Sequence, residues 1–598
     1  MFLTRVLRAS RSQCSPLSFP RHGLLPPSLR RSLAPLPRPW KIQHMRAHSL
    51  AQYNEQDLFS MTTCRWIYNE KQQLAHRYVP FNVNALIDIA VRSADATQCV
   101  SFKKISEGMT DRVSELKFDN DIEYIVKIPF PFAGPKHLGT ASEVATIDFI
   151  RSEFRIPAPA VRAWASHSEE TPVGTEYIMY ERLPGTSLSD YDKNDFPVHE
   201  DPYIRVLNIV KLIESQMTRR GFSQVGSIYY KEDVPQHLRD RPLYSNPHDE
   251  SVNSGRFRIG PIVDPEFWRS GRWSLNIDRG PWPDDRAYME ALGACARASV
   301  EAGLDLDPDD IYSRLISIYE ELVPHMSPMR TVKSLWHPNL HADNIIVDGE
   351  INVEDRGADT FVLSGITGWE EATVLPYYLH YEVPRAYSFV PEEETLVQYA
   401  ADGTPKLADG YEDLTDRAAA DYALRRAWRA YEHEITIRTY DVQLAKDMYG
   451  TEGANVLRLA TEPVTVITRG GYSVAPIARS IEVLHSIWNA LVGVDESRQP
   501  LVAFPPALSD EDKRWIEEEE ARIDRMVAMG GSVLDRLGLQ WMDEGLVPVE
   551  KYEEAKKTVE DARRAALAAA PSEEERQRIA QEWPFQDGKY AFSADRCW

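Results

Sequence analysis

The sequence has few cysteines and lacks long apolar runs. Its 598 residues include five cysteines, none in a Cys-x-x-Cys pair, which argues against a zinc ribbon and against a secreted disulfide framework. No stretch approaches the roughly 18 apolar residues that a membrane-spanning helix requires, so no integral membrane segment is predicted. The signatures GxxxxGK[ST], HExxH and GxSxG are also missing, and no zinc, haem or flavin site is evident.

Acidic residues are absent from the first 50 positions and abundant afterwards. The chain has 68 Lys and Arg against 91 Asp and Glu, and its net charge is −23. Eight Arg and one Lys lie within residues 1–50, which leaves a charge of −32 for the rest. Because nucleic-acid phosphates attract basic surfaces, this acidic body predicts no nucleic-acid partner.

The basic head has the composition of a mitochondrial transit peptide. It is rich in Arg and Ser, and residues 2–8 interleave apolar side chains with arginines. No apolar run of 7–15 residues follows, which argues against a secretory signal. We therefore expect residues 1–50 to be a disordered transit peptide and the protein to reach the mitochondrial matrix; a disordered basic tail is the alternative.

After the head, the pattern predicts a small antiparallel sheet with one helix. Helices are expected over residues 58–76 and 85–93, and strands in VSFKKISEG, VSELKF and YIVKIPF. A helix then opens at TASEVATIDFIRS, where Thr140 and Glu143 have the spacing of a capping box. Two further strands are predicted in IPAPAVRAWAS and GTEYIMYERLPG.

The rest of the chain is predicted to be mainly helical. A loop rich in Arg and Trp at residues 256–282 is expected to pack against the helices, with stacking on a ligand ring as the alternative. Residues 501–598 form an acidic helical extension whose first long helix is capped by Ser509. Its charge runs are expected to be solvated helix faces, and its helices are the expected contact for a protein partner.

The motif HPNLHADN, in a helical segment that follows a small sheet, is similar to the catalytic loop of protein-kinase-like phosphotransferases. With AGPKHLGTASEVATIDFIR, PVGTEYIMYERLPGTSL and DRGPW, the chain resembles the aminoglycoside phosphotransferase family and, within it, a group of fungal mitochondrial proteins. The resemblance covers most of residues 64–376. It implies an α+β, two-lobed kinase-like fold with a nucleotide cleft: an N-lobe at 51–183, a helical C-lobe at 184–500 with its catalytic-type loop at 336–348, and the extension.

Phosphoryl transfer needs a lysine on the phosphates, a carboxylate that holds the lysine, metal ligands and an acceptor for the hydroxyl proton. The resemblance assigns the first two roles to Lys127 and Glu143; a solvated strand lysine and a simple helix cap are the alternatives. It assigns Gly108 to the phosphate loop. That turn has a single glycine, and Met109 and Asp111 add bulk and negative charge, so weakened phosphate binding is expected.

The catalytic loop departs from the family pattern. His337, His341 and Asn344 stand where the family has its loop histidines and its metal-binding asparagine, and we expect the histidines mainly to support the loop. Asn339 replaces the catalytic aspartate, and an amide cannot accept a proton, a function worth roughly 10²–10⁴ in rate. Gly368 replaces the metal-binding aspartate, so one magnesium ligand is lost.

These departures predict a pseudoenzyme that binds a nucleotide, a metabolite or a protein partner, with weakened binding of ATP and magnesium. The alternative is an active ATP-dependent phosphotransferase on a small-molecule or protein hydroxyl, in which a relocated carboxylate replaces the lost ligand. The candidate carboxylates are Asp343, Asp348, Asp355, Asp359, Glu370 and Glu371.

Overall fold

The computed structural model describes residues 54–191, 202–269, 271–304, 310–325, 332–349, 362–376, 379, 396–409, 417–440, 475–505, 508–539 and 545–587. The predicted transit peptide and the candidate carboxylates Asp355 and Asp359 lie outside these ranges. Within them, no helix combines the length and the apolar character needed to cross a membrane.

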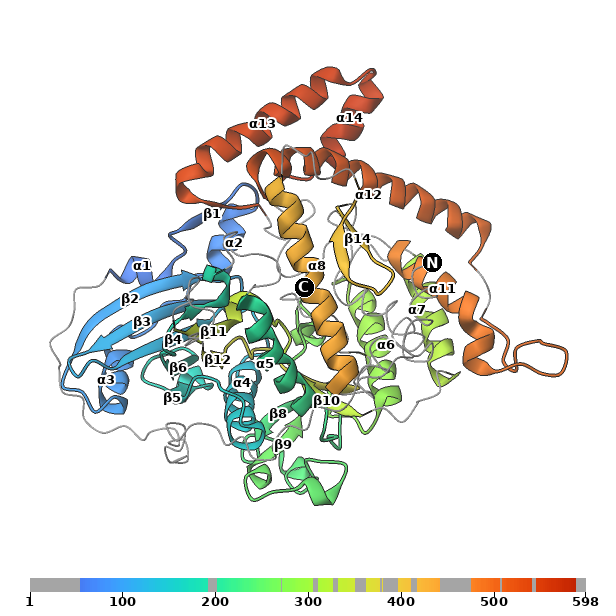
Figure 1. The fold of residues 1–598 in the computed structure, drawn as a ribbon. Helices are drawn as coiled ribbons and strands as arrows, with labels where there is room; N and C mark the ends of the chain where they lie inside the picture. The colour runs from blue at the N-terminus through green and yellow to red at the C-terminus, as the bar shows by residue number, and fades with distance from the viewer. Residues whose placement is uncertain are drawn as a thin grey trace.

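A five-stranded antiparallel sheet lies on the left of Figure 1. Its strands, in spatial order, are β2 (Cys99–Glu107), β3 (Asp111–Phe118), β4 (Glu123–Pro129), β6 (Tyr177–Glu181) and β5 (Val161–Ala165). These are the five strands predicted from the sequence. In β4, Tyr124, Val126 and Ile128 are buried on one face, and successive side chains alternate, so Ile125 and Lys127 lie on the other.

Two helices cover the two faces of this sheet. The apolar residues of α3 (Val83–Ser93) share a buried cluster with Val126 and Ile128, whereas those of α4 (Leu138–Phe149) pack on the face that carries Tyr180. The capping box predicted for α4 is absent. The helix begins earlier than expected, and the Thr140 hydroxyl donates to Glu176 (2.6 Å), which leaves Glu143 free to bond elsewhere.

The single helix predicted over residues 58–76 is wrong. The segment contains α1 (Glu55–Phe59), the short strand β1 (Cys64–Trp66) and α2 (Glu70–His76). Strand β1 pairs antiparallel with β16 (Leu546–Pro548), which lies near the other end of the chain. Because β16 supplies the hydrogen bonds that a helix would otherwise make internally, the local pattern gave no sign of this strand.

The remaining described chain is mainly helical, as predicted. Its helices are α5 (Pro202–Met217), α6 (Asp285–Glu301), α7 (Asp310–Leu322), α8 (Arg417–Tyr440), α11 (Ala475–Val492), α12 (Asp510–Leu537), α13 (Tyr552–Ala569) and α14 (Glu573–Glu582). Short antiparallel sheets join β8 (Ser227–Tyr230) to β9 (Phe257–Gly260), β10 (Lys333–Trp336) to β13 (Thr373–Pro376), β14 (Val397–Tyr399) to β15 (Pro405–Leu407), and β7 (Thr186–Ser187) to β11 (Ile345–Asp348) and β12 (Val362–Ile366).

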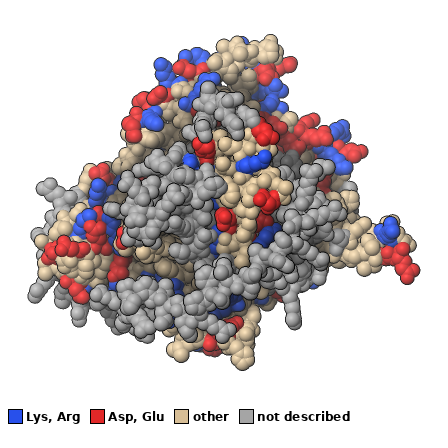
Figure 2. Space-filling model, viewed as in Figure 1, with Lys and Arg blue, Asp and Glu red and all other residues tan. Residues whose placement is uncertain are grey.

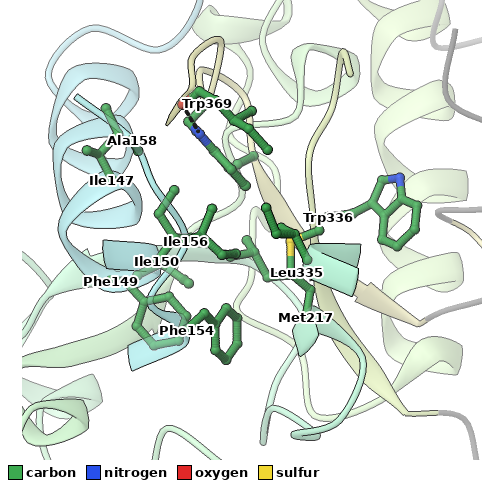
Figure 3. Packing of buried hydrophobic residues seen from close by; sticks show 14 of the residues in the cluster. Ile147, Phe149, Ile150, Phe154, Ile156, Ala158, Met217, Leu335, Trp336 and Trp369 are labelled. Atoms are coloured by element: carbon green, nitrogen blue, oxygen red, sulfur yellow. Dashed lines mark hydrogen bonds between the residues drawn. The ribbon is translucent and has the colours of Figure 1, made fainter. Parts of the chain in front are cut away.

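A large buried cluster joins α4 to the strands and helices that follow the sheet (Figure 3). The fully buried Phe149 ring lies 5.0 Å from Phe154, 5.8 Å from Phe222 and 5.3 Å from Phe257, measured between ring centroids. In a different buried cluster, Arg279 lies over the Trp268 ring at 4.1 Å, so this part of the 256–282 loop packs within the protein. The Phe149 cluster therefore fixes α4 relative to the chain beyond the sheet.

The extension crosses the top of the molecule in Figure 1. Helix α12 begins with a capping box between Ser509 and Asp512, which confirms the predicted cap. Acidic and basic side chains are mixed over these helices in Figure 2. Their inner faces are buried, because Leu534, Tyr552 and Trp583 pack with Tyr68 of the amino-terminal segment.

The Phe149 cluster makes a stability prediction. Phe149→Ala should destabilise the protein by about 3–5 kcal/mol, because a buried aromatic ring is lost and a cavity remains. Val252→Ala, at a side chain that is 96% exposed, should change stability by less than about 0.5 kcal/mol. Thermal and urea unfolding of both variants measures the difference. Equal stability of the two variants would contradict the assigned packing.

Candidate functional site

A cavity of about 490 Å³ lies between the sheet and a second wall made by β11, by Asn344 directly before it and by the loop that follows β12. Apolar side chains line it from both sides: Ile105, Val113 and Ile125 from strands β2 to β4, and Ile346 from β11. Its polar end includes Lys127, Glu143, Asp111, Asn344 and Glu370. The cavity thus combines an apolar slot with a charged end.

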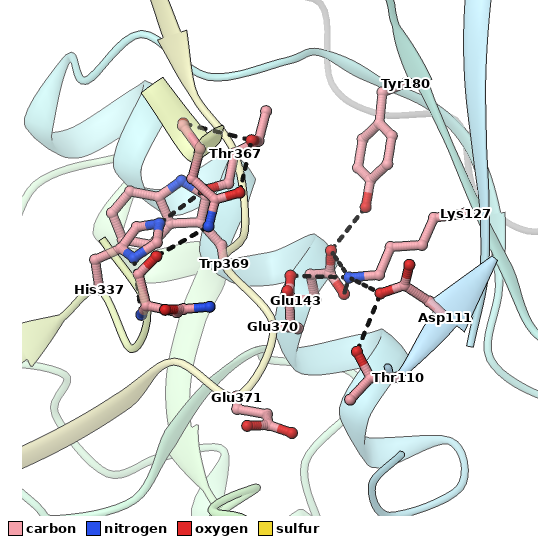
Figure 4. A network of polar contacts seen from close by, with 12 residues as sticks. Thr110, Asp111, Lys127, Glu143, Tyr180, His337, Thr367, Trp369, Glu370 and Glu371 are labelled. Carbon is pink, nitrogen blue, oxygen red and sulfur yellow. Dashed lines mark hydrogen bonds and ion pairs between the residues drawn. The ribbon is translucent and has the colours of Figure 1, made fainter. Parts of the chain in front are cut away.

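Lys127 lies at the centre of the charged end (Figure 4). Its Nζ is 3.0 Å from both carboxylate oxygens of Glu143, 2.9 Å from Glu370 Oε2 and 3.7 Å from Asp111 Oδ2. The Tyr180 hydroxyl donates to Glu143 Oε1 at 2.7 Å and holds that carboxylate in place. One ammonium therefore binds carboxylates from β3, from α4 and from the loop after β12.

The charge balance of this cluster favours a cation over an anion. Burial alone would lower the pKa of Lys127, but Glu143, Glu370 and Asp111 outweigh it and hold that pKa well above its usual value. Burial raises the pKa of Asp111 and of Glu143, the negative charge of Glu370 raises both further, and the attraction of Lys127 offsets these effects only in part. To bind Lys127, a phosphate group would have to displace the carboxylate of Glu370 from the ammonium or arrive with bound cations that neutralise its charge.

Gly108 lies at the tip of the β2–β3 hairpin, but glycine is not required there by the backbone. Its φ is not positive, and an added Cβ would meet Asp111 O and Oδ1 at 3.4 Å, an ordinary contact. Among the described residues that line the cavity, Asp111 is present and Gly108 is not. The hairpin thus presents a carboxylate to the cavity.

His337 braces the catalytic-type loop. Its Nε2 donates to the Thr367 carbonyl (2.7 Å), its Nδ1 accepts from the Asn339 backbone N–H (3.2 Å), and its ring meets the Trp369 ring edge to face at 4.5 Å. Burial lowers the pKa of His337 to about 4, so the imidazole is neutral at physiological pH. Both ring nitrogens are bonded to backbone groups, and His337 is not among the residues that line the cavity.

Asn344 is held by the same loop. Its Nδ2 donates to the Asn339 carbonyl (2.9 Å) and lies 3.2 Å from His341 Nε2. The other ring nitrogen of His341 lies 3.2 Å from Asp343 Oδ2. Asn344 lines the cavity, whereas the side chains of His337, Asn339 and His341 do not. Of the predicted site residues, the structure brings Lys127, Glu143, Asn344 and Gly368 to one cavity.

The residues present do not fit a magnesium ion in this arrangement. Gly368 has a φ of +78° and no carboxylate, and a Cβ built there would lie 2.4 Å from Asn344 Nδ2. An aspartate at this position would therefore require Asn344 to move. Within the described ranges, no group of three or more His, Cys, Asp or Glu side chains is placed to hold a metal.

The described candidates for a relocated carboxylate are engaged elsewhere. Glu370 binds Lys127, and Glu371 binds Arg269 through its Nη2 at 2.5 Å and points away from the lysine (Figure 4). Asp343 accepts from the Ser189 hydroxyl, and Asp348 is exposed at the end of β11. The sequence predicts Glu370 only as a candidate metal ligand and does not predict its ion pair with Lys127; the signal that could have found it is the position of Glu370 two residues after Gly368.

Comparisons with known proteins agree with the predicted resemblance. No protein-family model matches the chain. A subtelomeric hrmA-associated cluster protein of Aspergillus fumigatus is 27% identical over 331 residues, which cover 48% of this chain and 60% of that protein. Altered inheritance of mitochondria protein 9 of Yarrowia lipolytica is 21% identical over 478 residues, which cover 74% of this chain and 78% of that protein.

Among solved structures, an aminoglycoside phosphotransferase matches 68% of this chain and 98% of its own, with 11% identity and a TM-score of 0.33. The resemblance to the fungal mitochondrial proteins is therefore confirmed, and phosphotransferases are among the structural neighbours. The chain spans about three fifths of the length of the Aspergillus relative.

The neutral His337 makes a pH prediction. Its pKa in the folded protein is about 4 against an ordinary value of 6.5, so below pH 6.5 the unfolded chain binds a proton that the folded chain does not. Stability should fall by up to about 1.4 kcal/mol per pH unit between pH 6.5 and 4, with no contribution above 6.5. Urea unfolding of wild type and His337→Gln across this range tests it: the variant should show a flatter profile, and parallel profiles would contradict the assignment.

Proposed function

We propose that the protein is a two-lobed, kinase-like mitochondrial protein that binds a nucleotide in the cavity and has impaired or lost phosphoryl transfer. The observation that carries this proposal is the ion pair between Lys127 on β4 and Glu143 on α4, with both Nζ–O distances at 3.0 Å. A lysine held by a helix carboxylate at the end of an apolar slot is the arrangement that positions a nucleotide's phosphates in kinase-like proteins.

The shape of the cavity supports a nucleotide ligand. A planar base needs two apolar surfaces, and Ile105, Val113 and Ile125 lie on the sheet side while Ile346 lies on the other side. The volume of about 490 Å³ is in the range of small-molecule sites. Lys127 lies at the opposite, charged end, where phosphates would follow.

The loss of transfer chemistry rests on the two replaced aspartates. Asn339 cannot accept a proton, and its side chain does not line the cavity. Gly368 supplies no ligand, and Asn344, the remaining one, is bonded within its own loop. We therefore expect binding without efficient turnover, with a metabolite or a protein as a further binding partner of the same fold.

The mitochondrial location rests on the composition of residues 1–50 and on relatives that are named as mitochondrial proteins. We propose the N-lobe at 51–183, the C-lobe at 184–500 and the extension at 501–598, with the matrix as the final compartment. The phosphate acceptor, if transfer survives, is a small-molecule or protein hydroxyl.

An active enzyme with a relocated carboxylate is the second candidate. The observation in its favour is Glu370, whose carboxylate lines the cavity two residues after Gly368 and is one third exposed. On phosphate binding, a carboxylate released from Lys127 would become available to a phosphate-bound cation. The two candidates make different predictions for Glu370.

The first prediction concerns turnover. Nucleotide should raise the thermal unfolding temperature of the full chain, while magnesium-dependent ATP turnover stays at background. Asn339→Asp combined with Gly368→Asp should raise turnover at least tenfold, since an acid–base group is worth roughly 10²–10⁴. Gly368→Asp alone should give no gain, because Asn339 still provides no group that can accept the proton. Robust wild-type turnover that disappears in Lys127→Ala and Asn344→Ala would refute the loss of catalysis.

The second prediction concerns Glu370. Glu370→Gln removes the carboxylate that competes with phosphate for Lys127 and leaves the Lys127–Glu143 pair intact, so nucleotide affinity should increase roughly tenfold, which is about 1.4 kcal/mol. Glu371→Gln is the matched control, because Glu371 contacts Arg269 instead. Isothermal titration calorimetry measures both. If Glu370→Gln instead abolishes a magnesium-dependent turnover, Glu370 is a metal ligand and the active candidate is favoured.

A further inference from the structure

The tip of the β2–β3 hairpin is held from outside the sheet by Glu107, the last residue of β2. Its side chain is only 1% exposed. Its carboxylate accepts from the backbone N–H groups of Thr62 (3.1 Å) and Thr63 (3.0 Å), from the Thr63 hydroxyl (2.5 Å) and from the Lys104 ammonium. These bonds fix the chain immediately before the turn.

A second contact holds the other strand of the hairpin. Arg112, on β3, donates through Nη2 to the backbone carbonyl of Arg77, which directly follows α2 (3.0 Å). The Arg77 guanidinium is fully buried, 4.6 Å above the Trp66 ring and 4.8 Å from the Phe132 ring. Both strands of the hairpin are thus tied to residues 62–77.

Residues 62–77 are held in turn by the extension. Strand β1 pairs with β16 along its whole length, Val549 N–H donates to the Thr63 carbonyl (3.0 Å), and Ile67 N–H donates to the Gly545 carbonyl (3.0 Å). Thr63 therefore bonds to Glu107 through its N–H and to the extension through its carbonyl. Apolar packing reinforces these bonds, because Ile67 and Tyr68 lie in the buried cluster formed by α12, α13 and Trp583.

The opposite end of the turn faces the cavity. Asp111, four residues after Glu107, lies 3.7 Å from Lys127 Nζ and lines the cavity, and Gly108 N–H bonds to the Asp111 carbonyl (2.9 Å). This short turn transmits any displacement of Glu107 to Asp111. The distance between the hairpin tip and Lys127 therefore depends on the contacts of Glu107 and Arg112 with residues 62–77.

We propose that the extension, acting through β1 and Glu107, positions the hairpin tip over the cavity, and that Glu107 is a positioning residue for nucleotide binding. The consequence for nucleotide rests on the proposed function. The single glycine of this turn, Gly108, does not adopt a left-handed backbone conformation. The position of the tip is therefore attributed to the contacts of Glu107 with residues 62–63 and, through them, to the extension. The β16 and α13 face that contacts residues 62–77 is occupied within the chain and is not free for another protein.

The test compares variants of the full chain by hydrogen exchange and by nucleotide titration. Glu107→Gln replaces one carboxylate oxygen with an amide N–H₂, which cannot accept a hydrogen bond from the N–H groups of Thr62 and Thr63 or from the Lys104 ammonium. Val547→Asp puts a charge at a buried position of β16 that does not contact the hairpin in the β16–β1 register. The matched control is Val527→Asp, at a position of α12 that is 46% exposed. A second control, Glu123→Gln, removes a carboxylate at the far end of β4.

We expect Glu107→Gln and Val547→Asp to speed exchange of the peptide that spans residues 104–113 by about tenfold or more. They should also weaken magnesium–ATP affinity by roughly threefold to tenfold, because Ile105 and Val113 of the same hairpin line the apolar part of the cavity. Both controls should match the wild type in both measurements. Val547→Asp should also speed hydrogen exchange at residues 62–77 and 545–587, because any loosening of the extension would break the contacts between these two segments.

The proposal is overturned if Val547→Asp speeds exchange at residues 545–587 while residues 104–113 exchange as in the wild type. It is equally overturned if Glu107→Gln leaves the turn protected. Failure of the wild type to bind magnesium–ATP would refute the proposed function, and the exchange measurements would then decide on the positioning role by themselves.

Discussion

The structure depends on one buried ammonium that is shared by carboxylates from separate segments. Lys127 of β4 binds Glu143 of α4, Glu370 of the loop after β12 and, at longer range, Asp111 of β3. Removing one partner of a buried ion pair typically costs about 3–5 kcal/mol, because it leaves an uncompensated charge. The sheet, α4 and the loop after β12 are therefore held in one arrangement, and an anionic ligand would compete with these carboxylates for Lys127.

Much of the fold around this cluster follows from local sequence. Alternation in YIVKI buries Val126 and Ile128 and leaves Lys127 on the other face, as the structure has it. The spacing from Thr140 to Glu143 suggested two roles for the glutamate, and the earlier start of α4 decides between them, since Thr140 bonds to Glu176. The motif HPNLHADN likewise predicts a loop that its own side chains support. The His337 ring accepts from the Asn339 N–H, and the Asn344 amide contacts the Asn339 carbonyl and the His341 ring.

The parts that could not be predicted depend on distant contacts or on backbone conformation. Strand β1 exists because β16 comes from the far end of the chain to pair with it. Glu370 reaches Lys127 because the turn around it contains Gly368 at a φ of +78° and Glu371 at +61°, and the second is a rare conformation for a glutamate. Spacing alone placed Glu370 near the lost ligand, but it could not show that the side chain turns toward the ammonium.

Helix α12 connects two separately packed regions of the described chain. Its first turns pack with α7 and α11 through Ile516 and an ion pair between Asp512 and Arg314, and its last turns pack with residues 67–68 through Val533 and Leu534. At 1.5 Å per residue, its 28 residues span about 42 Å. A change in the separation of these two regions would have to bend α12 or detach one of its ends. Helix α12 thus couples the packing of α7 and α11 to that of the amino-terminal segment, although none of its residues lines the cavity.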